Sequence, residues 1–264
     1  MCGALGDKTM ADIKRILQKQ FCVSIDRFKE GVLNSTPWAP RSILMSEGFA
    51  FCAVSDMLGV DVVLESGVYN GRSTQIWANY FPSGVPIIAI DRRNFRETTI
   101  NRLKSYKNVE LTKGDGPNVI SDLIPKFSDK KISIFMDGPK DIPALDFAKK
   151  VLPLPNVVLV AIHDMSVTKG RFEKNHPFGR KRELYFPQSR IEFDKWELGQ
   201  FLTDEEWFVK GYSWLDKDES QFDSKQKLRW TPYVIIGTDR PDRELNSYGP
   251  TVGFAFQWES NNVS

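Results

Sequence analysis

Two carboxylates and two glycines of this chain have the order and spacing of a nucleotide-binding unit. Glu65 ends one apolar run, Gly67 and Gly71 form a turn after it, a helix-like segment covers 73–80, and Asp91 ends the next apolar run. Glycines let the backbone approach a ligand closely, and a carboxylate at a strand end can accept hydrogen bonds from ribose hydroxyls. Strand, glycine turn, helix, strand and acid therefore predict a nucleotide-binding βαβ unit.

The glycine spacing differs from that of two well-known phosphate-binding loops. A dinucleotide fingerprint needs Gly-x-Gly-x-x-Gly, whereas Gly67 and Gly71 are separated by three residues and no third glycine is in place. A P-loop needs Gly-x-x-x-x-Gly-Lys-Ser/Thr, whereas this turn is one residue shorter and carries Arg72. The pattern disfavours an NAD-dependent enzyme, and a tight turn without any ligand remains an alternative.

The elements around this turn alternate regularly along the chain. Apolar runs predict five strands, and the segments between them have helical spacing or helix-start signals. Such alternation is typical of a parallel sheet. The predicted strands are 62–65, 86–90, 108–112, 131–136 and 156–162, and the predicted helices between them are 73–80, 94–106, 117–127 and 141–152. In the helix 94–106, Ile100 and Leu103 are both expected to face inward.

Polar side chains gather at the ends of these predicted strands. Because open α/β sheets bind ligands at the carboxyl ends of parallel strands, these side chains are expected to share one crevice. They are Glu65, Asp91, Asp115, Asp137, Lys140, His163 and Asp164.

Segments outside the alternating part complete the predicted domain. Helical patterns at 10–21 and 46–59 come before the first strand, and they suit either a lid over a substrate or a structural cap on the sheet. Apolar runs at 233–237 and 251–256 predict two more strands, and the short loop between them makes them antiparallel. The stretch 165–195 mixes basic and aromatic residues, which suits an acidic ligand or, alternatively, a solvated loop.

The glycine turn and the element order resemble class I S-adenosylmethionine-dependent methyltransferases. Glu65-x-Gly67-x-x-x-Gly71-x-Ser73 is similar to their motif I. The resemblance implies a Rossmann-like α/β fold, with a seven-stranded, mostly parallel sheet, terminal antiparallel strands and helices on both faces. We expect a single domain over 1–264, with a helical cap (1–59), a cofactor-binding core (60–165), an insert or acceptor region (166–230) and terminal antiparallel strands (231–264).

The same resemblance implies which residues bind S-adenosylmethionine. Glu65 and Gly67 are expected near its methionine part, Asp91 on the ribose hydroxyls, and Asp115 and Gly116 near the adenine. The full expected set is Glu65, Ser66, Gly67, Tyr69, Gly71, Ser73, Asp91, Arg92, Asp115 and Gly116.

A narrower resemblance begins at 134–140 and 161–164. These segments look like those of catechol O-methyltransferase-like enzymes and their cephalosporin-hydroxylase-like and macrolide-sugar relatives. In those families an aspartate at the place of Asp137 binds a divalent cation, and a lysine three residues later can act as general base. The resemblance implies Asp137, Lys140 and His163 as catalytic residues, and Asp137, His163 and Asp164 as ligands of Mg²⁺ or another divalent cation.

This chemistry suits the methylation of a hydroxyl. A cation held by carboxylates can bind the hydroxyl oxygen and lower its pKa, and a lysine of lowered pKa can take the proton. His163 departs from the family pattern, which generally has Asp or Glu there. It leaves three readings open: a ligand of a softer metal, a base beside a weak or absent metal, or a hydrogen-bonded core residue.

Composition limits the partners. A net charge of +2 gives no support for nucleic acid or an anionic membrane, and no apolar run reaches the roughly 18 residues of a membrane span. The scattered Cys2, Cys22 and Cys52 suit reduced thiols in a cytoplasmic protein. We expect an O-methyltransferase for a small molecule or sugar. The alternatives are a metal-independent N-methyltransferase and a non-catalytic S-adenosylmethionine-binding protein, and a homo-oligomer stays open.

Overall fold

The computed structural model describes most of the chain up to residue 165 and parts of the remainder. The described residues are 10–36, 43–165, 192–193, 195–196, 198–200, 202, 205–216 and 251–256. The predicted strand 233–237 and most of the predicted insert lie outside them.

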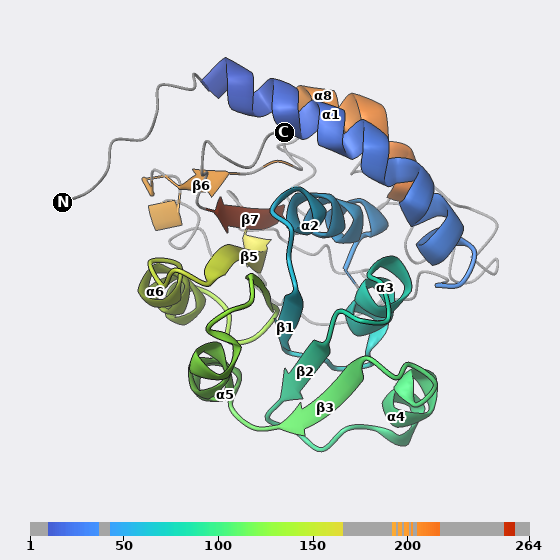
Figure 1. The fold of residues 1–264 in the computed structure, drawn as a ribbon, viewed down its shortest axis with the longest axis vertical. Helices are drawn as coiled ribbons and strands as arrows, with labels where there is room; N and C mark the ends of the chain where they lie inside the picture. The colour runs from blue at the N-terminus through green and yellow to red at the C-terminus, as the bar shows by residue number, and fades with distance from the viewer. Residues whose placement is uncertain are drawn as a thin grey trace, which may run out of the picture.

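A seven-stranded sheet in the order β3-β2-β1-β4-β5-β7-β6 forms the centre of the molecule (Figure 1). The first five strands run parallel, while β7 pairs antiparallel with both β5 and β6. This confirms the fold class that the sequence predicted. The strands are β1 (Val62–Ser66), β2 (Ile87–Asp91), β3 (Val109–Lys113), β4 (Ile132–Met136), β5 (Val157–Met165), β6 (Gly199–Gln200) and β7 (Thr251–Phe256).

Helices cover both faces of the sheet. Successive residues of a strand point to opposite faces, so Val63 joins the core on one side and Val62 and Leu64 the core on the other. One face packs against α2 (Met45–Met57) and α3 (Arg72–Tyr80), and the other against α5 (Gly116–Leu123) and α6 (Ile142–Val151). On the first face α1 (Met10–Phe28) lies across α2 as an outer layer, beside α8 (Glu206–Tyr212) (Figure 1).

Most predicted elements are present, with three differences in detail. The first helix continues seven residues past its predicted end, through Phe28. The short helix α4 (Glu97–Leu103) buries Leu103, but Ile100 is 46% exposed, so the inward orientation expected for Ile100 is wrong. Strand β6, only two residues long, has no apolar run and was not predicted.

Within the described residues, no helix has both the length and the apolar composition to cross a bilayer. Cys22 and Cys52 are both free thiols.

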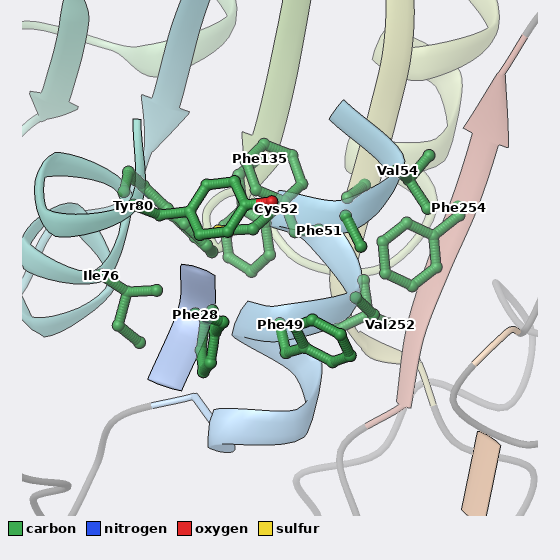
Figure 2. Packing of buried hydrophobic residues seen from close by; sticks show 14 of the residues in the cluster. Phe28, Phe49, Phe51, Cys52, Val54, Ile76, Tyr80, Phe135, Val252 and Phe254 are labelled. Carbon is green, nitrogen blue, oxygen red and sulfur yellow. The ribbon is translucent and has the colours of Figure 1, made fainter. Parts of the chain in front are cut away.

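Aromatic rings fill the core between α2, α3 and the sheet (Figure 2). Phe51 on α2, Trp77 on α3 and Phe135 on β4 meet with ring centroids 4.5 to 5.3 Å apart, and all three are fully buried. Edge-on and tilted contacts of this kind add to the hydrophobic gain of burial. These rings fix α2 and α3 relative to β4, the strand that carries the site described below.

Replacing Phe135 tests this core. We expect Phe135→Ala to lower the free energy of unfolding by about 3–5 kcal/mol, since it leaves a cavity among rings that cannot close around it. Urea denaturation measures the change, with Val23→Ala, at a position 65% exposed, as the matched control. A loss no larger than that of the control would show that the three rings are not tightly packed.

Candidate active site

The ends of β1 and β4 form the point where the order of the sheet reverses. From β1 the chain moves outward to β2 and β3, and it then returns to place β4 on the other side of β1. Open α/β sheets bind ligands beyond the strand ends at such a point. Here the two strand ends touch directly, because the Asp137 amide donates to the Ser66 carbonyl at 2.7 Å.

The turn after β1 has an unusual backbone. Gly67, Tyr69 and Gly71 all have positive φ, of 95°, 45° and 70°. A Cβ on Gly67 would lie 2.9 Å from the carbonyl carbon of Asp137, so only glycine lets the turn approach β4 this closely. A non-glycine residue at positive φ, such as Tyr69, stores strain that the surrounding contacts must hold, and such strain is common at ligand sites.

Asp91 holds this turn in place. One carboxylate oxygen accepts the backbone amides of Val68 and Tyr69, each at 3.1 Å, and the other accepts the amide of Arg93 at 2.9 Å. Thr99 on α4 donates to the Tyr69 carbonyl at 3.1 Å. A carboxylate has about four acceptor positions. Asp91, which the sequence predicted as a ribose ligand, therefore uses about half of them on the turn and a third bond on the backbone after β2.

Glu65 contacts the start of α3. Its carboxyl group is fully buried and accepts the hydroxyls of Ser73 and of Thr74, the latter at 2.6 Å. Burial raises the pKa of Glu65 to about 7, although the two hydroxyl hydrogen bonds lower it in part. The structure thus brings the predicted Glu65 and Ser73 together, as a buried pair.

The other predicted cofactor residues lie around the same edge. The Ser66 hydroxyl donates to the Gly138 carbonyl, and a Cβ on Gly116 would overlap that hydroxyl, so the starts of three loops meet here. Arg92 and Asp115 are exposed, just after the ends of β2 and β3.

Asp137, Lys140 and His163 come together at the ends of β4 and β5. Oδ1 of Asp137 accepts Nζ of Lys140 and lies 2.9 Å from Nδ1 of His163. Nζ of Lys140 is 3.5 Å from the same ring nitrogen, but the shorter contact indicates that Nδ1 donates to Asp137. The sequence predicted that these residues share one crevice, and the structure places them within hydrogen-bond reach.

Glu47 on α2 is a fourth member that the sequence analysis missed. Its Oε2 lies 3.3 Å from Nε2 of His163 and accepts the backbone amide of Leu44 at 2.9 Å. The side chain of Glu47 is only 1% exposed. The one available signal was a charged residue near the start of an otherwise apolar helix, 46–59.

Acidic and basic groups alternate along this cluster, from Glu47 through His163 and Asp137 to Lys140. Burial by itself raises the pKa of Asp137, but the charges of Lys140 and His163 and their hydrogen bonds outweigh burial and hold that pKa below its usual range. Carboxylates lie near both ring nitrogens of His163, and a nearby negative charge favours the protonated form of an imidazole.

This arrangement does not fit the predicted divalent cation. A metal needs free lone pairs, but Oδ1 of Asp137 faces two donors and both nitrogens of His163 face carboxylates. Of the polar atoms in these two side chains, only the other oxygen of Asp137 has no such contact within the described part of the chain. The side chain of the third predicted ligand, Asp164, lies outside the described residues. Among the side chains that are described, no group of three or more His, Cys, Asp or Glu has an arrangement that could hold a metal ion.

Comparison with known proteins gives similar solved structures only. TomG, an O-methyltransferase of tomaymycin synthesis from Streptomyces achromogenes in complex with S-adenosylmethionine, is 17% identical over 69% of this chain and 80% of its own, with a TM-score of 0.41. A putative O-methyltransferase from Klebsiella pneumoniae is 14% identical over 74% and 83%, with a TM-score of 0.41. An O-methyltransferase from Bacillus cereus in complex with SAH is 16% identical over 75% and 84%, with a TM-score of 0.36. No family model and no curated protein sequence matches the chain.

Gly67→Ala tests the close approach of the turn to β4. We expect a loss of roughly 2 kcal/mol or more in the free energy of unfolding, because the new methyl group meets backbone and φ is positive. Gly84→Ala is the control, since a Cβ there would have no neighbour within 4 Å. Equal stability of the two variants in urea denaturation would contradict the geometry of the turn.

Glu65→Gln tests the buried carboxyl group. The pKa of Glu65 is about 7 in the folded chain against an ordinary 4.5, so the unfolded chain loses this proton first as pH rises. Glu65 then lowers stability progressively between pH 4.5 and about 7, by about 3 kcal/mol in total. We expect the stability of Glu65→Gln relative to the wild type to rise by this amount from pH 4.5 to pH ~8 in urea denaturation. A constant difference across this range would show that Glu65 titrates normally.

Proposed function

We propose that this protein is an S-adenosylmethionine-dependent methyltransferase that methylates a hydroxyl group of a small molecule or sugar. The observation that carries the proposal is the position of the charged cluster. The backbone of Asp137 lies directly beside Gly67. The cluster and the strained glycine turn therefore both lie at the point where the order of the strands in the sheet reverses. A nucleoside held by the turn would place its reactive end at the cluster.

The turn side of this edge fits a bound nucleoside. A Cβ on Gly138 would meet no atom within 4 Å, so backbone there is not covered by side chains. Arg92 and Asp115 are exposed at neighbouring strand ends and can supply polar contacts. When bound, S-adenosylmethionine would supply a methyl carbon that an oxygen nucleophile attacks as the carbon–sulfur bond breaks.

Lys140 is the member of the cluster that reaches the acceptor. Its side chain and that of Asp137 are each 29% exposed, whereas those of His163 and Glu47 are nearly buried, and of the two exposed groups only Lys140 can donate a hydrogen bond. The ion pair with Asp137 favours the ammonium form, which is a donor and not a base. In place of the general base expected from the sequence, we propose that Lys140 donates a hydrogen bond to the acceptor oxygen and so lowers the pKa of the acceptor hydroxyl. The hydroxyl proton passes to water, and the oxyanion held by the ammonium then attacks the methyl carbon as the carbon–sulfur bond breaks.

The rest of the cluster keeps this donor in position. Asp137 binds the ammonium of Lys140. Asp137 is itself fixed by His163 and by the hydrogen bond from its backbone amide to the Ser66 carbonyl. Holding the acceptor oxygen in line with the methyl carbon supplies much of the rate gain in such transfers. The proposed chemistry uses no divalent cation, since Asp137 and His163 bind each other.

Calorimetry and a methyl-transfer assay test the proposal together. We expect S-adenosylmethionine to bind the wild type, and Lys140→Ala to keep that affinity while transfer to an acceptor from a phenol and sugar panel falls roughly 100-fold. Lys149→Ala, at an exposed lysine on α6, is the matched control. A chelator should leave transfer unchanged.

Each alternative gives a different result in these assays. No binding of S-adenosylmethionine by the wild type would remove the proposed function altogether. Binding without transfer to any acceptor would favour the non-catalytic alternative, and transfer only to amines the N-methyltransferase. Loss of transfer in chelator would restore the metal-assisted mechanism.

A further inference from the structure

We propose that Glu47 is a positioning residue of this active site, which fixes the ring of His163 and through it the Asp137–Lys140 pair. The inference rests on the proposed function for its catalytic consequence. Its structural part, the hold of Glu47 on His163, stands on distances and burial alone. It extends the site beyond the strand ends, to a helix that comes before the nucleotide-binding turn in the chain.

Burial requires Glu47 to have strong partners. A buried carboxylate without compensation costs several kcal/mol. Glu47 is 1% exposed, and two contacts to Oε2 offset this cost: the amide of Leu44 at 2.9 Å and Nε2 of His163 at 3.3 Å. Because the amide is neutral, His163 is the group that balances the charge in these contacts.

The backbone that carries Glu47 is held firmly. Glu47 lies in the first turn of α2, where the helix dipole favours a negative charge. The neighbouring Phe49 is fully buried and packs against Phe21 and Phe28 of α1, with ring centroids 5.3 and 5.2 Å away. Figure 2 shows Phe28 beside Phe49. The carboxylate is thus fixed by the core before any ligand binds.

His163 is held at both ends of its ring. Glu47 faces Nε2 and Asp137 faces Nδ1, so a rotation of the imidazole would break both contacts. The ring of Phe135 lies beside it, tilted by 39° with centroids 6.1 Å apart. A fixed imidazole fixes Oδ1 of Asp137, and the same oxygen sets where the Lys140 ammonium lies.

Removing the charge of Glu47 should therefore affect transfer more than binding. In Glu47→Gln the amide oxygen can still accept the Leu44 amide, which keeps the start of α2, but no charge balances Nε2 of His163. The contact of Nδ1 with Asp137 remains, but the ring loses its contact at Nε2, so the imidazole and with it Lys140 are held less firmly. We expect kcat to fall roughly tenfold or more with KM for the acceptor changed less than about twofold, because only positioning in the transition state is lost.

Nitrogen NMR gives a direct readout of the ring. The chain has two histidines, His163 and His176, so ¹⁵N-histidine labelling yields two imidazoles, and a His176→Gln variant assigns them. In the wild type both nitrogens of His163 should show the shifts of protonated nitrogens. In Glu47→Gln the Nε2 signal should move while the protein stays folded.

Asp56→Asn is the matched control. Asp56 is a carboxylate near the other end of α2 that pairs with Arg27 at 3.0 Å, so its loss weakens the helix contacts without touching His163. It should leave the His163 signals and kcat unchanged.

A second test combines Glu47→Gln with His163→Gln. If Glu47 acts through His163, the double variant should be no slower than His163→Gln alone.

Unchanged His163 signals in Glu47→Gln, or additive effects in the double variant, would overturn the proposal. A fall in kcat matched by Asp56→Asn would overturn it as well, because general weakening of α2 would then be the cause. If the wild type does not bind S-adenosylmethionine, the proposed function fails, and the NMR result still decides whether Glu47 holds the ring.

Discussion

The close contact between the ends of β1 and β4 is the constraint on which the site depends. Gly67 can lie against the Asp137 backbone only because it has no side chain, and the Ser66 carbonyl takes the Asp137 amide. This contact places a strained turn and a charged cluster on one edge of the sheet. With a wider spacing, the turn held by Asp91 and the side chains after β4 and β5 would face separate surfaces.

The members of the charged cluster differ in how deeply they are buried. Glu47 and His163 lie in the interior, where each charge requires its neighbour, while Asp137 and Lys140 are partly open to solvent. The cluster is therefore rigid at its inner end and accessible at its outer end. Helix α2 supplies the innermost charge, so the helices before β1 help to build the site, whether or not they also cover a substrate.

The fold could be predicted from sequence because strand and helix patterns alternate cleanly between 62 and 165. Residues at strand ends could be placed on one edge for the same reason, as Asp137, Lys140 and His163 show. The partners of individual side chains could not be predicted from the sequence. Whether Asp91 binds a ligand or the turn depends on angles within the turn, and Glu47 meets His163 only through packing across more than a hundred residues of sequence. Ile100 illustrates the same limit, since its spacing from Leu103 alone did not show that the buried face of α4 is formed by Thr99 and Leu103.

Strand β7 has a consequence for how the chain folds as it is synthesised. It lies between β5 and β6, so the sheet cannot be completed until residues 251–256 have left the ribosome. Until then β5 is an unpaired edge, with Leu159, Val160 and Ala161 awaiting partners that come almost a hundred residues later. Contacts between such distant segments form slowly, and an open apolar edge invites pairing with other chains. Until β7 is inserted, a nascent chain of this protein therefore carries a β5 edge that is open to pairing with other strands.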